Sequence, residues 1–123
     1  MAIRGIRGAI TVENNTKEDI LKETTTLLQD MMSQNDLDID EIASVFFSVT
    51  QDVTADFPAV AARNLGLIHT PLLCLTEIPV PKSLASCIRI LIQVNTEKKQ
   101  QEMIHSYLKK AASLRPDKAT ACQ

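Results

Sequence analysis

The stretch Cys87-Ile88-Arg89-Ile90-Leu91-Ile92-Gln93-Val94 decides the fold. It is rich in β-branched residues, which favour strands. Side chains alternate across a strand, so one face is wholly apolar and must be the core side: Ile88, Ile90, Ile92 and Val94. Arg89 then points the other way, between Cys87 and Leu91. Its guanidinium always carries charge and donates in a fork that suits carboxylates, so Arg89 either forms an ion pair at an interface or binds an anion, and both alternatives stay open here.

Hydrophobic periodicity predicts the other elements. We expect strands over residues 2–12, 42–50 and 70–77, and helices over 17–34, from about 56 to 65, and from 97 to about 112. Thr16 offers an N-cap for the long helix, Asp56 one for the short helix, and Gly66 ends the latter. The last helix rests on residues at helical spacing, among them Gln100, Met103, Ile104, Tyr107, Leu108 and Ala111. The order β-α-β-α-β-β-α predicts an α/β (α+β) domain, with helices on one face of a mixed sheet.

The other face of this sheet needs a cover. Arg7 and Arg89 both lie opposite the apolar side of their strands, among small and apolar neighbours. Gly5 and Gly8 in the first strand indicate a bulge or the close approach of another group. A charged yet partly apolar face suggests burial against a second copy of the chain, so we expect a homo-oligomer.

Composition excludes several classes of protein. The chain has 123 residues, enough for one domain with a sizeable core, and 45% of them are apolar. Its 13 basic and 15 acidic residues give a net charge of −2, which argues against nucleic acid as a partner. Three widely spaced cysteines fit neither a disulfide framework nor a zinc site, and no stretch suits a signal peptide or a membrane span. We therefore expect a reduced, cytoplasmic protein without a metal.

Few residues suggest chemistry. Glu77 ends a predicted strand just before a loop, and with Arg7 and Arg89 it would place one acceptor among two cations. Such a set suits a substrate with carboxylates and a hydroxyl, and the chain has no phosphate loop or dinucleotide fingerprint. Cys74 with a histidine as a nucleophilic pair is disfavoured, because no family signature surrounds that cysteine. Tyr107 is expected to pack in the core at the edge of the last helix.

The sequence resembles a family. The opening Ile3-Arg4-Gly5-Ile6-Arg7-Gly8-Ala9-Ile10-Thr11-Val12-Glu13 is similar to the start of the small α/β chorismate mutases, the monofunctional trimeric AroH class. The resemblance continues, in order and at nearly fixed spacing, through Asp56-Phe57-Pro58-Ala59, Arg63, Pro71-Leu72-Leu73-Cys74-Leu75-Thr76-Glu77, Cys87-Ile88-Arg89, Tyr107-Leu108-Lys109-Lys110-Ala111 and Leu114-Arg115-Pro116-Asp117. It implies a barrel-like homotrimer with sites between subunits, over a single domain at 1–116, with a mobile tail at 117–123.

The resemblance also implies an activity and a role for each site residue. The family converts chorismate to prephenate, in aromatic amino-acid biosynthesis, by a concerted rearrangement with no cofactor. Arg89 would donate to the ether oxygen of the breaking bond and Glu77 would accept from the ring hydroxyl, while Arg7 and Tyr107 would hold a carboxylate. The remaining substrate-binding residues would be Phe57, Ala59 and Arg63 from the neighbouring subunit, with Leu73, Cys74, Leu75, Thr76, Leu114 and Arg115.

Two departures and two alternatives accompany the resemblance. Val60 stands where relatives carry a lysine, and the segment from Asn64 to Thr70 is a residue shorter than in some of them. Both features concern substrate capture more than the chemical step. The alternatives are an imine deaminase of the Rid type, whose own motifs are missing from this sequence, and a non-catalytic trimer that binds a metabolite.

Overall fold

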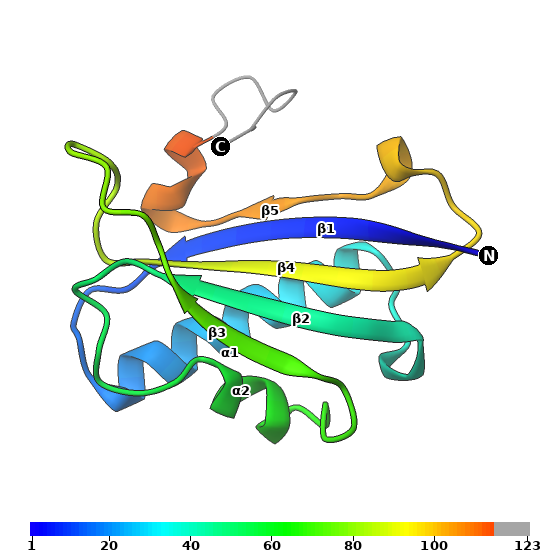
Figure 1. Cartoon of the computed structure of the whole chain (residues 1–123), viewed down its shortest axis with the longest axis horizontal. Helices are drawn as coiled ribbons and strands as arrows, with labels where there is room; N and C mark the ends of the chain where they lie inside the picture. The colour runs from blue at the N-terminus through cyan, green and yellow to red at the C-terminus, as the bar shows by residue number, and fades with distance from the viewer. Residues whose placement is uncertain (115–123) are drawn as a thin grey trace.

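A computed structural model describes residues 1–114. The chain forms β1 (Ala2–Thr11), α1 (Lys17–Gln34), β2 (Ile42–Val49), α2 (Ala59–Asn64), β3 (Leu72–Thr76), β4 (Cys87–Thr96) and β5 (Ser106–Tyr107). Three short 3₁₀ turns complete it: η1 (Ile39–Glu41), η2 (Gln100–Glu102) and η3 (Lys109–Leu114). The five strands form one sheet in the order β3-β2-β4-β1-β5 (Figure 1). The central pairs β1–β4 and β4–β2 are antiparallel and the outer pairs β2–β3 and β1–β5 are parallel, so the predicted mixed sheet is confirmed.

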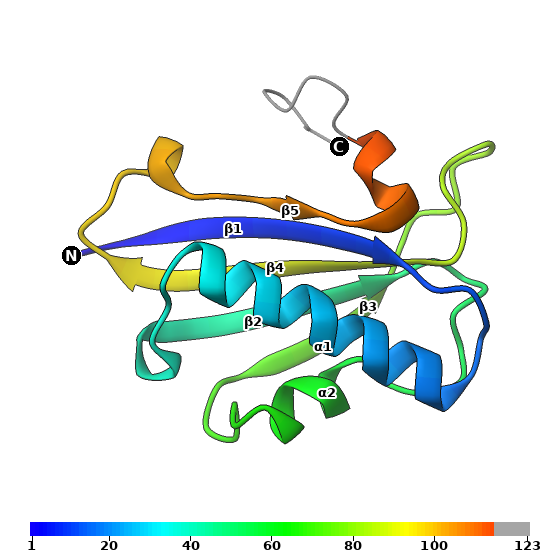
Figure 2. The same ribbon diagram turned by 180° about the vertical axis from the view of Figure 1, so that it is seen from behind.

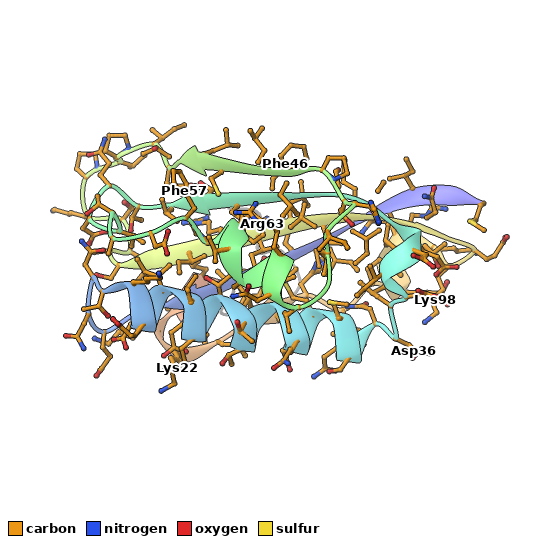
Figure 3. All side chains as sticks on the ribbon, turned by 90° about the horizontal axis from the view of Figure 1, so that it is seen from below. Lys22, Asp36, Phe46, Phe57, Arg63 and Lys98 are labelled. Atoms are coloured by element: carbon orange, nitrogen blue, oxygen red, sulfur yellow. The ribbon has the colours of Figure 1, made fainter. Side chains whose placement is uncertain are left out.

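Both helices cover the same face of the sheet (Figure 2). Thr16 caps α1 as expected, because its hydroxyl accepts a hydrogen bond from the Asp19 amide at 3.1 Å. The stripe of α1 that faces the sheet is fully buried, as Leu27, Leu28 and Met31 show. In the view from below, Lys22 of α1 points away from the sheet, and Phe46 of β2 lies on the opposite side (Figure 3). The prediction of helices on one face is confirmed.

The apolar side of β4 forms the centre of the core. Its residues Ile88, Ile92 and Val94 are fully buried. Ile92 pairs with Ile6 of β1 and with Val45 of β2, which are fully buried on the same face. The β1–β4 register runs without a bulge from Ala2 to Thr11, so a bulge in this pairing does not explain the glycines of β1. A Cβ atom on Gly8 would lie 2.5 Å from Met31 Sδ, which shows that α1 packs directly on the backbone there. Of the two explanations offered for these glycines, close approach is the correct one at Gly8.

The expected helix over residues 97–112 is wrong. The chain instead forms η2, the short strand β5 and η3. Its backbone and side chains bond to distant partners: Gln100 donates to and accepts from the backbone of Gly5, and the Ile104 amide donates to Asn35 Oδ1 at 2.8 Å. These tertiary hydrogen bonds replace the i to i+4 bonds that a helix would have formed.

The expected cap of the short helix is also wrong, although its end is confirmed. α2 begins after Pro58 with no side-chain cap, and Asp56 Oδ1 accepts instead from the adjacent Phe57 amide at 2.7 Å. The helix ends as predicted before Gly66, whose φ of +107° lies in the region that favours glycine.

Opposite α1 and α2, the sheet has an open face that neither of these two α-helices covers. Odd-numbered residues of β1 and β4 point to this face, as the pairing of Ala9 with Arg89 and of Arg7 with Leu91 shows. At one end of the sheet, η3 and the loop between β3 and β4 rise beside this face (Figure 1). Within the part of the chain that the structure describes, no helix is long and apolar enough to cross a membrane.

Candidate active site

Arg89 lies on the open face, near the start of the central strand β4. On β4 it pairs with Ala9 of β1 and with Ser48 of β2, two small residues that leave room for its long side chain. Its side chain is 19% exposed, so most of it is shielded from solvent while the guanidinium still reaches the surface. A partly buried guanidinium interacts with an anion more strongly than an exposed one, because less water screens the charge.

Two hydrogen bonds position Glu77 beside Arg89, one made by its backbone and one by its side chain. Its amide donates to the carbonyl of Val49 at 2.8 Å, which extends the β2–β3 pairing by one residue. Its Oε1 accepts from the Ser48 hydroxyl at 2.5 Å, and its Oε2 lies 3.7 Å from Arg89 Nε. That distance is an ion pair but too long for a hydrogen bond between these two atoms. Both side chains also line one hollow between the β3–β4 loop and η3, so a polar group bound there can reach both of them.

Arg7 and Tyr107 come to the same face from β1 and β5. Arg7 pairs with Leu91, two residues along β4 from Arg89, which makes the two arginines diagonal neighbours. The Arg7 amide donates to His105 Nδ1 at 2.9 Å, so this histidine supports the β1 backbone. Tyr107 pairs in parallel with Ala9. It lies in a strand at the site and not on a core-facing helix, which corrects its expected placement.

Two hollows meet at Arg89. The strand-face hollow encloses about 150 Å³ and is lined by residues of four strands: Arg7, Gly8, Ala9, Phe46, Ser48, Arg89, Ile90, Leu91 and Tyr107. The loop hollow, of about 590 Å³, lies between the β3–β4 loop and η3 and is lined by Glu77, Ile78, Val80, Lys82, Ser83, Leu84, Arg89, Ser113 and Leu114. Arg89 is the residue common to both, and each hollow holds at least one more charged side chain.

Cys87 lies beneath the site and is not a nucleophile. Its side chain is fully buried with Ala9 and Ala111. Burial raises the pKa of the Cys87 thiol, and the neighbouring Arg89 guanidinium only partly opposes that shift. A thiol with a raised pKa stays protonated and unreactive at neutral pH. Cys87 therefore acts as a small apolar support for the arginine.

The remaining expected site residues lie in other parts of the chain. Phe57, Cys74, Leu75 and Thr76 line an edge hollow of about 390 Å³ along β3. Phe57 is 66% exposed and Leu73 is 51% exposed, whereas Ala59 is buried in the core of its own chain. Arg63 lies exposed on α2, away from the open face (Figure 3). Leu114 lines the loop hollow, while Arg115 and the tail at 117–123 lie outside the described residues.

The site offers cations and a carboxylate but no metal cluster. Residues 1–114 contain no group of three or more histidine, cysteine or acidic side chains that could hold a metal ion. His69 is exposed and Cys74 packs partly against the core, so the disfavoured nucleophilic pair has no geometric support here. The arrangement can bind a substrate with two or more anionic groups and a hydroxyl, and it can stabilise negative charge that develops near Arg89.

Comparison with known proteins agrees with this chemistry. The sequence profile of the family described as chorismate mutase type I matches residues 3–118. The chain belongs to this family. It is 48% identical over 120 residues to the chorismate mutase AroH of Thermus thermophilus, covering 97% of this chain and 98% of that protein. It is 42% identical over 118 residues to the chorismate mutase AroH of Bacillus subtilis (strain 168), covering 95% and 93% of the two chains.

A solved structure supports the same assignment. The chorismate mutase from Clostridium thermocellum superposes with a TM-score of 0.88 at 48% identity, over 89% of this chain and 98% of that chain. The resemblance noted in the sequence is thereby confirmed, as is the fold class. These similarities do not favour the imine deaminase or the non-catalytic alternative.

Sequence reasoning missed the side chains that complete the site of this chorismate mutase family member. Ser48, which holds Glu77, lies in a strand predicted correctly, but only the β2–β4 register brings it beside Arg89. Lys82 and Leu84 come from a loop without periodicity. The alternation along β2 could have placed Ser48 on the same face as Phe46, and no signal in the chain could have given the register.

Proposed function

We propose that this protein isomerises chorismate to prephenate at the site around Arg89, without a cofactor. The observation that carries the proposal is the placement of Arg89 and Glu77, 3.7 Å apart between Nε and Oε2, on a face that also presents Arg7 and Tyr107. Chorismate has carboxylates, a ring hydroxyl and an ether oxygen, so each polar group of the substrate has a partner of the right kind here.

The mechanism requires electrostatics and no general base. In a concerted rearrangement the carbon–oxygen bond lengthens and negative charge gathers on the ether oxygen. The Arg89 guanidinium donates to that oxygen and binds the transition state more strongly than the ground state. An acceleration of about 10⁶-fold corresponds to only ~8 kcal/mol, which a few fixed charges can supply.

The other side chains select the reactive conformer. Glu77, held by the Ser48 hydroxyl, accepts a hydrogen bond from the ring hydroxyl. Arg7 and Tyr107 hold a carboxylate of the side chain and so keep it folded over the ring. Fixing a flexible dicarboxylate in its compact form removes much of the entropic barrier. Leu114 covers the site beside the loop hollow, with Arg115 following it in the sequence.

We also propose a homotrimer in which a neighbouring subunit completes each site. The open face and the β3 edge expose large apolar side chains, among them Phe57, Leu73 and Leu75. A patch of this kind is typical of a protein–protein interface. In the trimer, the edge hollow of one subunit, with Phe57, Cys74, Leu75 and Thr76, would face the Arg89 site of the next. Arg63 and Leu73 would approach the same site from α2 and β3, and Ala59 would support it from the core. Residues 1–116 would form one domain, and free Cys74 and Cys87 are compatible with a cytoplasmic location.

The decisive experiment follows the ultraviolet absorbance of chorismate mixed with the purified protein. We expect the absorbance to decay with formation of prephenate, and a chain that binds chorismate without decay would refute the proposal. Arg89→Ala should lower kcat by about 10²–10³-fold, the usual loss for one oxyanion donor. Arg89→Lys should recover little of it, because one ammonium cannot reproduce the fork. Light scattering should give three chains per particle for all of these proteins, and a monomer would contradict the shared site.

A further inference from the structure

The last described segment crosses from one face of the sheet to the other. Tyr107 pairs with Ala9 on the open face, and the Leu108 amide donates to the Ala9 carbonyl at 2.9 Å. The Leu108 side chain packs against the core on the helix side, whereas Ala111 is fully buried on the open face with Ala9. The crossing between Leu108 and Ala111 therefore fixes where Tyr107 and, further on, Leu114 reach the site.

Lys109 occupies the crossing in a conformation that needs support. Its φ of +55° lies in the left-handed region, which a residue with a side chain adopts only when its surroundings impose it. The next residue, Lys110, donates its amide to the Thr11 hydroxyl at 3.3 Å, which ties the crossing to the end of β1.

The support for Lys109 comes from α1. Lys109 Nζ lies 2.5 Å from Glu23 Oε2, and the Glu23 side chain is only 6% exposed although it carries a charge. This hydrogen bond is the main cause of the raised pKa of Lys109, and the carboxylates of Glu13 and Asp19 add to it. A buried carboxylate must be paired, so Glu23 dictates the position of the ammonium and thereby of the crossing.

We propose that Glu23 and Lys109 form a positioning pair for the active site, which holds Tyr107 and Leu114 in place from the opposite side of the sheet. Neither member touches either hollow, so both act through the segment they anchor. The inference rests on the proposed chorismate mutase activity, since its effect is on substrate binding. Arg89 and Glu77 stand on other elements and keep their geometry when the pair is broken.

The test uses single, double and control variants of the full-length protein. Glu23→Gln and Lys109→Met should each raise KM for chorismate roughly tenfold while kcat changes less than about twofold, because binding groups move and Arg89 does not. The charge reversal Glu23→Lys with Lys109→Glu rebuilds the pair, but it places the new carboxylate near Glu13 and Asp19, so KM should return only part of the way to the wild-type value. Lys110→Met removes the same charge from the adjacent exposed residue and should leave KM unchanged.

A second readout does not depend on activity. Tyr107 is the one tyrosine of a chain without tryptophan, so its fluorescence reports on the segment directly. Acrylamide should quench this fluorescence more strongly in both single variants than in wild type, Lys110→Met and the charge reversal. If the wild-type protein did not convert chorismate, the proposed function would be refuted, but the quenching measurement would still test the Glu23–Lys109 pair. Unchanged quenching and KM in folded single variants, with only a lower Tm, would overturn the positioning role.

Discussion

Replacing Gly8 by alanine tests the contact on which the two layers of the fold depend. The new methyl group would lie 2.5 Å from Met31 Sδ and 3.1 Å from both Met31 Cγ and Leu27 Cδ1. Ordinary contacts between such atoms are about 3.5–4.0 Å, so the helix side chains must retreat by about 1 Å. Met31 and Leu27 are both fully buried, which leaves them no solvent to move into.

The expected cost follows from these distances. Overpacking of this kind lowers the free energy of unfolding by about 1–3 kcal/mol. Replacing glycine also makes the unfolded chain less flexible, which raises the free energy of unfolding by roughly 0.5–1 kcal/mol. The midpoints of these two ranges leave a net loss of about 1 kcal/mol, which corresponds to a fall in Tm of roughly 3–6 °C for a domain of this size. The assay is thermal unfolding followed by circular dichroism, at one fixed protein concentration because an oligomer's Tm depends on it.

Gly5→Ala is the matched control in the same strand. Its Cβ would lie 3.5 Å from Leu91 Cδ1, an ordinary contact, so its Tm should equal or exceed that of wild type. Met31→Ala should cost less in the Gly8→Ala background than alone, with a coupling of at least about 1 kcal/mol. The reasoning is refuted if Gly8→Ala unfolds at the temperature of Gly5→Ala, or if the Gly8 and Met31 effects simply add.

Two further predictions concern charge and burial beside the site. Hydrogen bonds, first from the Thr50 hydroxyl and then from the Ser86 amide and hydroxyl, lower the pKa of Asp52, which holds the start of β4. A lowered folded-state pKa gives stability that is present above the unfolded pKa of about 3.9 and is lost as pH falls through the folded-state pKa. Wild type should therefore exceed Asp52→Asn in urea stability at pH 7, and this advantage should shrink as the pH is lowered below about 4. The buried Cys87 thiol, with its raised pKa, should react far more slowly with a thiol reagent at pH 8 than Cys74 does; mass spectrometry of labelled peptides locates the modified residue, and equal rates would contradict the burial.

The sequence predicted those parts of the fold in which the pattern of neighbouring residues determines whether a side chain is buried or exposed. Alternation in β4 identified both the core face and the unusual position of Arg89. The N-cap of α1 and the apolar stripe along this helix were predicted equally well. Strand β5 was not predicted, because the apolar residues around it are spaced as in a helix although its backbone pairs with β1. Met103 and Tyr107 lie at helical spacing, yet one packs in the core and the other on the open face. Periodicity cannot reveal partners that lie about a hundred residues away.

The candidate site was predictable to a similar degree. The residue pattern grouped Arg7, Glu77 and Arg89, the family resemblance added Tyr107, and the fold brings all four to one face. What the residues alone could not provide is the register that sets Ser48 beside Glu77, since a shift of one residue would turn that hydroxyl to the other face.

The position of β1 has a consequence for how this chain is made. It precedes the other four described strands in the chain, but its neighbours in the sheet are β4 and β5, which are synthesised only after β2 and β3. Until Cys87 and the residues after it appear, the apolar side of β1 has only α1 to pack against. Sheets built from such distant segments fold slowly and leave unpaired edges exposed in the meantime. The strand that contributes Arg7 therefore waits longest for its partners, and we expect the open face of the sheet to form late.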